Sequence, residues 1–112
     1  MSPTREYGDY LADMVEATEK VAAFVRGMTL QEFLADDKTQ FAVVRALEIL
    51  GEAAKKLPGS FTAKYPEVPW REVAGMRDVL AHDYFGVNAQ VVWRTAVEDV
   101  PRIAEALRSL PR

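Results

Sequence analysis

DDKTQFAVVRALEILGEAAKKLPG, residues 36–59, is the stretch that decides the fold of this chain. Asp36 and Asp37 supply an N-cap and negative charge in a first helical turn, and a Pro-Gly pair closes the stretch. The pattern predicts a long helix from about residue 38 to residue 57. Its apolar stripe consists of Val43, Leu47, Leu50, Ala54 and Leu57, widened by Phe41, Val44 and Gly51. Such a stripe requires other helices to cover it.

The same helix also carries an ionic stripe. Arg45, Glu48 and Glu52 recur at spacings of three and four residues, which places them on one face. One interpretation is a solvated, salt-bridged surface, in which each pair contributes a few tenths of a kcal/mol. The other is the lining of an interface or a cleft. The residues alone leave both interpretations open.

The segment before this helix predicts a helix and a turn. Apolar residues repeat at three and four positions over residues 7–25, which is typical of an amphipathic helix. Gly27 stands where a left-handed C-cap is expected. Thr29 and Glu32 match a capping box for a short helix through residue 34.

The segment after it predicts a capped turn and a second long helix. Residues 60–65 are compatible with one helical turn, and Pro69 suits the first position of the next helix. That helix should end around residues 83–86, close to a glycine.

A last helix follows, with Asn88 as its N-cap and a kink at Pro101, which has no backbone N–H to donate. Glu98 is placed to pair with Arg94 and Arg102. The apolar residues at helical spacing are Trp93, Val97, Val100, Ala104 and Leu107.

Together these segments predict an all-α, single-domain, up-and-down helical bundle over residues 1–112, with four main helices plus short helical turns. At this length one modest core is possible. There is no strand-like alternation, no repeat and no low-complexity linker.

Composition excludes several classes of function. With 14 basic and 17 acidic residues the net charge is -3, so no global positive field attracts nucleic acid, and no helix is basic enough to recognise DNA. One histidine and no cysteine leave no credible zinc or di-iron site, and the glycine spacing matches no nucleotide-binding loop. No cofactor or metal is therefore expected. The absence of a membrane span or a signal core favours a cytoplasmic protein.

The residues best suited to catalysis lie in MRDVLAHDYFG, residues 76–86, which contains the only histidine. Arg77 is a permanent cation, and His82 titrates near neutral pH. A structural interpretation competes with the catalytic one. In it, His82 is a helix-end residue whose charged form is favoured by Asp78 and Asp83, and Arg77 is an ion-pair partner of Glu48 or Glu52. Sequence chemistry suggests a site here without naming its reaction.

Helix geometry constrains this site. Five residues along a helix leave Arg77 and His82 about 140° apart, whereas Asp78 and His82 share a face. Three solutions remain open: the helix unwinds near His82, the long arginine bends around it, or a second copy of the chain completes the site. A two-fold axis near this helix would bring two arginines and two histidines into one cleft.

Arg77, His82 and Tyr84 form an R-x4-H-x-Y motif, and with it the chain resembles the HepT-like toxins of the HEPN superfamily. The resemblance extends over nearly the whole chain. It is also carried by AVVRALEILGEAA at residues 42–54, YPEVPW at residues 65–70, and Val92-Trp93 through Val100-Pro101.

The resemblance implies a metal-independent ribonuclease that dimerises through the face bearing the motif and acts as the toxin of a type VII-like toxin-antitoxin pair. By the same resemblance, His82 would be the general acid or base and Arg77 would stabilise developing charge. Arg45, Glu48, Glu52 and Asp78 would support them. Asp78 stands where the family commonly has asparagine, and it would raise the basicity of His82 while placing negative charge near a phosphate.

Tyr84 is implied as the control point, because an MntA-type minimal nucleotidyltransferase antitoxin transfers AMP groups to the tyrosine of this motif. A structural alternative packs Tyr84 against Trp70. A rival function is a non-catalytic HEPN subunit that binds nucleotide or scaffolds the nucleotidyltransferase.

Overall fold

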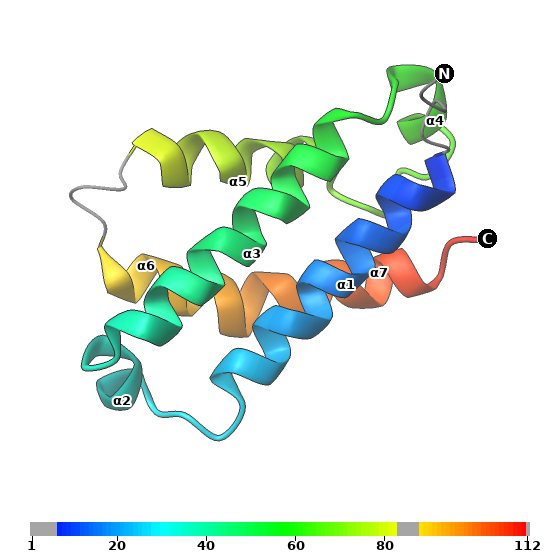
Figure 1. Cartoon of the computed structure of the whole chain (residues 1–112). Helices are drawn as coiled ribbons and strands as arrows, with labels where there is room; N and C mark the ends of the chain where they lie inside the picture. The colour runs from blue at the N-terminus through cyan, green and yellow to red at the C-terminus, as the bar shows by residue number, and fades with distance from the viewer. Residues whose placement is uncertain (1–6, 83–87, 112) are drawn as a thin grey trace, which may run out of the picture.

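Helices account for nearly all of the regular structure in this chain (Figure 1). The computed structural model describes residues 7–82 and 88–111, and for residues 78–82 it describes the backbone alone. Within these ranges no strand occurs, which confirms the predicted all-α bundle. The elements are α1 (Tyr7–Val25), α2 (Leu30–Leu34), α3 (Asp37–Lys55), α4 (Gly59–Thr62), α5 (Trp70–His82), α6 (Ala89–Arg94), the π-helical segment η2 (Thr95–Asp99) and α7 (Val100–Arg108).

Helix α3 lies at the centre of the bundle. It packs against α1 on one side and α5 on the other, and α1 also packs along α7 (Figure 1). Val43, Leu47 and Leu50 of the predicted apolar stripe are fully buried. Phe41, which was expected to widen the stripe, is 58% exposed, so that part of the prediction was wrong. Met14 of α1 and Val73 of α5 are equally inaccessible and belong to the same core. The central position of α3 therefore follows from its apolar stripe, which two helices cover.

The predicted caps at the start of the bundle are confirmed. Gly27 has a φ of 74°, the left-handed conformation that glycine adopts without a steric penalty. The N–H of Glu32 donates to the Thr29 hydroxyl at 3.1 Å, and the N–H of Thr29 donates to the Glu32 carboxylate at 2.8 Å. Asp36 accepts from the N–H of Thr39 at 3.0 Å and so caps α3. These local bonds turn the chain back from α1 into α3.

Two boundaries differ slightly from the prediction. Helix α3 ends at Lys55, and the N–H of Leu57 donates to the Ala54 carbonyl at 3.2 Å in a tightened final turn. Pro69 does not occupy the first helical position. It directly precedes Trp70, and its carbonyl accepts from the N–H of Val73. The predicted end of α5 at residues 83–86 lies outside the described residues.

The last helix changes its hydrogen bonding directly before Pro101, the position of the expected kink. Its described backbone continues through η2, where the N–H of Val100 donates to the Thr95 carbonyl five residues earlier. This π-helical turn lies directly before the proline, and π-turns add a residue to a helix. The buried face consequently follows Ala96 and Val100, whereas Val97 is 38% exposed. The expectation that Val97 belongs to the apolar stripe was therefore wrong.

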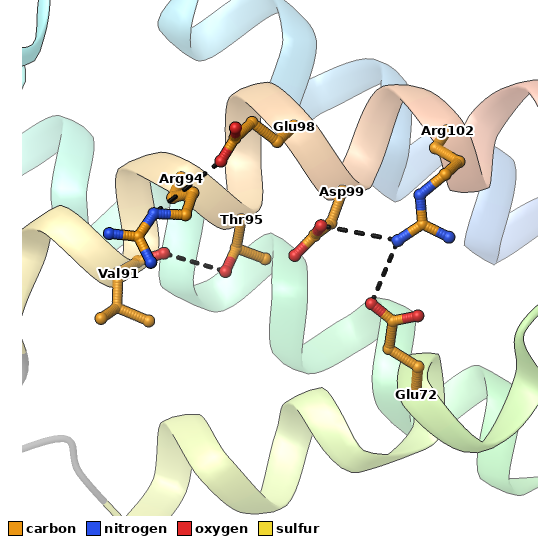
Figure 2. A network of polar contacts seen from close by, with 7 residues as sticks. All are labelled: Glu72, Val91, Arg94, Thr95, Glu98, Asp99 and Arg102. Carbon is orange, nitrogen blue, oxygen red and sulfur yellow. Dashed lines mark hydrogen bonds and ion pairs between the residues drawn. The ribbon is translucent and has the colours of Figure 1, made fainter.

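Exposed ion pairs lie along this last helix, and one of them joins it to α5 (Figure 2). Arg102 donates to Glu72 of α5 at 3.2 Å and to Asp99 at 3.5 Å, so these two carboxylates, rather than Glu98, are its recorded partners. The predicted pair between Arg94 and Glu98 is present at 3.8 Å. All of these groups face solvent, so each pair contributes at most about 1 kcal/mol.

Candidate active site

The backbone of α5 carries three of the predicted site residues on one continuous helix. Arg77, Asp78 and His82 all lie within its bounds, and His82 is its last described residue. Tyr84 lies outside the described residues, as does its suggested contact with Trp70. The Trp70 indole N–H donates to the Tyr65 carbonyl at 2.9 Å, and its ring lies 6.3 Å from that of Phe61.

Continuity of α5 removes one of the three solutions to the angular problem. Because the helix is intact through His82, unwinding before that residue does not occur. Positions 77 and 82 are therefore separated by about 140° around the helix axis. A bent arginine or a second copy of the chain remains as the way to bring both groups to one phosphate.

The Arg77 side chain is directed towards α3 by an ion pair. Its Nε lies 3.2 Å from Oε1 of Glu52, which is the ion pair that the structural interpretation of Arg77 expected. The two side chains are 46% and 45% exposed. An ion pair at this exposure contributes about 0–1 kcal/mol to stability, so its main effect is on where the guanidinium lies.

The ionic stripe of α3 divides into two parts. Arg45 lies 4.0 Å from Glu48 along the helix, at the limit of an ion pair, and the Arg45 side chain is 63% exposed. Glu52, one turn further along, reaches across to α5 instead. The solvated, salt-bridged interpretation fits Arg45 and Glu48, whereas Glu52 pairs with a residue of a second helix.

Comparison of the sequence with known proteins shows the family to which the chain belongs. The family model described as ribonuclease HepT-like matches residues 14–110. The chain belongs to the HepT-like ribonuclease family. A probable ribonuclease HepT from Thermococcus cleftensis is 52% identical over 99 residues, covering 88% of this chain and 90% of the relative. A putative RNase from Methanocaldococcus jannaschii is 44% identical over 99 residues, covering 88% and 82%. No solved structure matches the chain.

One contact in this HepT-like chain was missed by the sequence reasoning, which placed Gly51 only on the apolar stripe. A Cβ added at Gly51 would lie 2.9 Å from the Arg77 backbone nitrogen and 3.2 Å from the Val73 carbonyl oxygen. Helices α3 and α5 therefore lie in close contact beside Arg77. The available signal was a glycine in the middle of a helix of good helix formers, where it costs about 1 kcal/mol relative to alanine.

Among the described side chains, no three histidine, cysteine, aspartate or glutamate residues gather as metal ligands would. None of the described helices is long and apolar enough to cross a membrane. The arrangement that can act chemically is a helix-borne arginine, oriented by a carboxylate, that shares its helix with the only histidine.

Proposed function

We propose that this chain is an endoribonuclease whose reaction uses Arg77 and His82. The observation that carries the proposal is an exposed Arg77 that pairs with Glu52 of α3 and shares helix α5 with His82, in a chain of the HepT-like ribonuclease family. RNA supplies both the nucleophile and the electrophile, because a ribose 2'-hydroxyl lies next to the phosphate that it attacks. The protein then needs to move protons and stabilise charge.

In the proposed reaction the 2'-oxygen forms a bond to phosphorus while the bond from phosphorus to the 5'-oxygen breaks. The products are a 2',3'-cyclic phosphate and a free 5'-hydroxyl. His82 accepts the proton of the 2'-hydroxyl or donates one to the leaving 5'-oxygen, and Arg77 stabilises the charge on the phosphate oxygens. Asp78 precedes His82 by one helical turn and would favour its charged form. No step of this scheme requires a metal ion.

We also infer that two copies of the chain form the active cleft. The separation of positions 77 and 82 around one intact helix supports this inference, because a two-fold axis beside α5 lets each phosphate meet groups from both copies. His82 would then serve as the base, and His82 of the partner subunit as the acid. Sedimentation of the protein at micromolar concentration should show a dimer, and a monomer alone would contradict this arrangement.

RNA cleavage tests the catalytic proposal. A pool of random-sequence RNA is incubated in excess chelator with the unaltered protein, Arg77→Ala and His82→Ala. We expect cleavage by the unaltered protein and a fall of about 100- to 1,000-fold in each variant, the range typical of losing one charge-stabilising donor or one general acid-base group. Undiminished cleavage by both variants would overturn the assignment. Loss of all cleavage in chelator, restored by a divalent metal, would overturn metal independence.

For regulation, we propose that the chain is the toxin of a toxin-antitoxin pair whose minimal nucleotidyltransferase transfers AMP from a nucleoside triphosphate to the Tyr84 hydroxyl, releasing pyrophosphate. Added phosphate charge would occupy Arg77 and repel RNA. After co-expression with the partner, the protein should gain mass in multiples of AMP, and Tyr84→Phe should not. Mass retained on the phenylalanine variant would place the modification on another residue.

A second candidate is a non-catalytic nucleotide-binding or scaffold subunit of the same system. The carboxylate of Glu52 beside Arg77, together with the net charge of -3, favours it, since both weaken attraction for RNA. Binding of the nucleotidyltransferase without any RNA cleavage by the unaltered protein would support this candidate.

A further inference from the structure

Helices α3 and α5 approach each other closely beneath Arg77. An ideal Cβ at Gly51 would fall 2.9 Å from the backbone nitrogen of Arg77, 3.0 Å from its Cβ and 3.2 Å from the carbonyl oxygen of Val73. Two of these three atoms are backbone atoms, and the third is fixed directly to the backbone. None of them is the far end of a flexible side chain. A methyl group at position 51 would therefore have to displace α5 itself.

The atoms that Gly51 meets belong to one turn of α5. Val73 and Arg77 are four residues apart, the spacing of an α-helical hydrogen bond between a carbonyl and an N–H. Gly51 thus contacts the helical turn from which the Arg77 side chain starts. By contrast, a Cβ added at Gly75, within the same helix α5, would meet no atom within 4 Å.

Glu52, the residue after Gly51, holds the guanidinium end of the Arg77 side chain. Glu52 Oε1 lies 3.2 Å from Arg77 Nε. Two consecutive residues of α3 therefore fix the position of Arg77: Gly51 contacts its backbone, and Glu52 pairs with its guanidinium. The guanidinium has five N–H donors, so a bond at Nε leaves terminal donors for a phosphate.

We propose that Gly51 and Glu52 are positioning residues for Arg77, and that they set where its guanidinium meets the phosphate of an RNA substrate. This inference rests on the proposed ribonuclease function. A displacement of about 1 Å of a catalytic group costs on the order of 100-fold in rate. Glycine at position 51 lowers the stability of α3 relative to alanine, and this cost is what allows α5 to pack at this distance from α3.

The test compares Gly51→Ala with Gly75→Ala, which makes the same chemical change in a neighbouring helix without a contact. The first readout is the NMR signal of the Arg77 Nε–H group in the intact protein, read beside the backbone amide spectrum. We expect this signal to move in Gly51→Ala and to stay in place in Gly75→Ala, while most backbone signals remain native in both. The second readout is RNA cleavage, which should fall about 10- to 100-fold in kcat for Gly51→Ala only.

The outcomes separate this inference from the proposed function. If the unaltered protein cleaves RNA and Gly51→Ala behaves like Gly75→Ala, the positioning role is wrong. A fall in cleavage with an unmoved Arg77 signal would also overturn it, because the loss would then arise elsewhere. If the unaltered protein does not cleave RNA, the proposed function fails and the Arg77 signal alone decides the positioning role.

A second variant covers the case in which Gly51→Ala does not fold. Glu52→Ala removes an exposed carboxylate and should leave the bundle folded, because an ion pair at this exposure contributes little stability. It should move the Arg77 Nε–H signal and lower kcat. An unmoved signal in this folded variant would overturn the proposal.

Discussion

Replacing Glu52 with glutamine separates the charge of this residue from its hydrogen bond. The amide oxygen of Glu52→Gln can still accept from Arg77 Nε, but the negative charge 3.2 Å away is removed. That carboxylate competes with an RNA phosphate for the same guanidinium. We therefore expect RNA to bind more tightly to Glu52→Gln than to the unaltered protein.

The size of the effect follows from distance and exposure. Two unit charges 3.2 Å apart attract by about 1.3 kcal/mol in bulk water and about 5 kcal/mol at an effective dielectric constant of 20. Both side chains are nearly half exposed, so solvent screening and side-chain entropy reduce the net value to about 0–1 kcal/mol. Since 1 kcal/mol is a factor of about five, KM for RNA should fall by up to about fivefold at low salt. The unfolding free energy should change by less than about 1 kcal/mol.

The assay is steady-state cleavage of one defined RNA over a range of salt concentrations. The fall in KM should shrink as salt rises, because screening weakens interactions between exposed charges. The matched control is Glu16→Gln, which removes the same charge from an exposed α1 pair with Lys20 at 3.1 Å. An unchanged or raised KM in Glu52→Gln, or an equal fall in Glu16→Gln, would refute the competition between Glu52 and phosphate.

Two predictions concern stability. Phe33 is fully buried, and its ring centre lies 5.3 Å from that of Trp93. Phe33→Ala should therefore lower the unfolding free energy by about 3–5 kcal/mol. The control Phe24→Ala, at a position that is 39% exposed, should lower it by about 1 kcal/mol or less. Urea unfolding followed by tryptophan fluorescence measures both, and equal losses would contradict the packing. The Thr39 hydroxyl donates to the Asp36 carboxylate, and the Thr39 N–H donates to it as well. These hydrogen bonds, the hydroxyl first, lower the pKa of Asp36 from its ordinary value of 3.8. The charged carboxylate therefore stabilises the fold above pH 3.8, and this contribution is lost as pH falls through the lower pKa of the folded state. Asp36→Asn should therefore be less stable than the unaltered protein near neutral pH, with the difference shrinking below pH 3.8, and a pH-independent difference in thermal unfolding would contradict this linkage.

The sequence was a good guide where the determining interactions are local. The caps at Thr29, Asp36 and Asn88 each join a side chain to a backbone N–H two or three residues away, so spacing alone predicts them. The same holds for Gly27, whose left-handed conformation depends on its own lack of a Cβ. The order of the main helices followed from these signals and from apolar periodicity.

The sequence was a poorer guide in the last helix, where a π-turn adds one residue and changes which side chains face the core. Pro101 signalled an irregularity, but periodicity did not predict that a π-turn would precede it. The turn moved Ala96 into the core and left Val97 exposed. A pattern that assumes 3.6 residues per turn cannot predict which side chains are buried after such an insertion.

By itself the sequence determined the helices, their caps and the single stretch that contains Arg77 and His82. The sequence offered Glu48 or Glu52 as the partner of Arg77, and the tertiary structure pairs it with Glu52. Only the tertiary structure decided that the α5 turn beneath Arg77 packs directly on Gly51. The reason is physical. Caps and periodicity act within a few residues along the chain, whereas the Arg77 contacts join residues 25 or more positions apart and depend on how closely two helices pack.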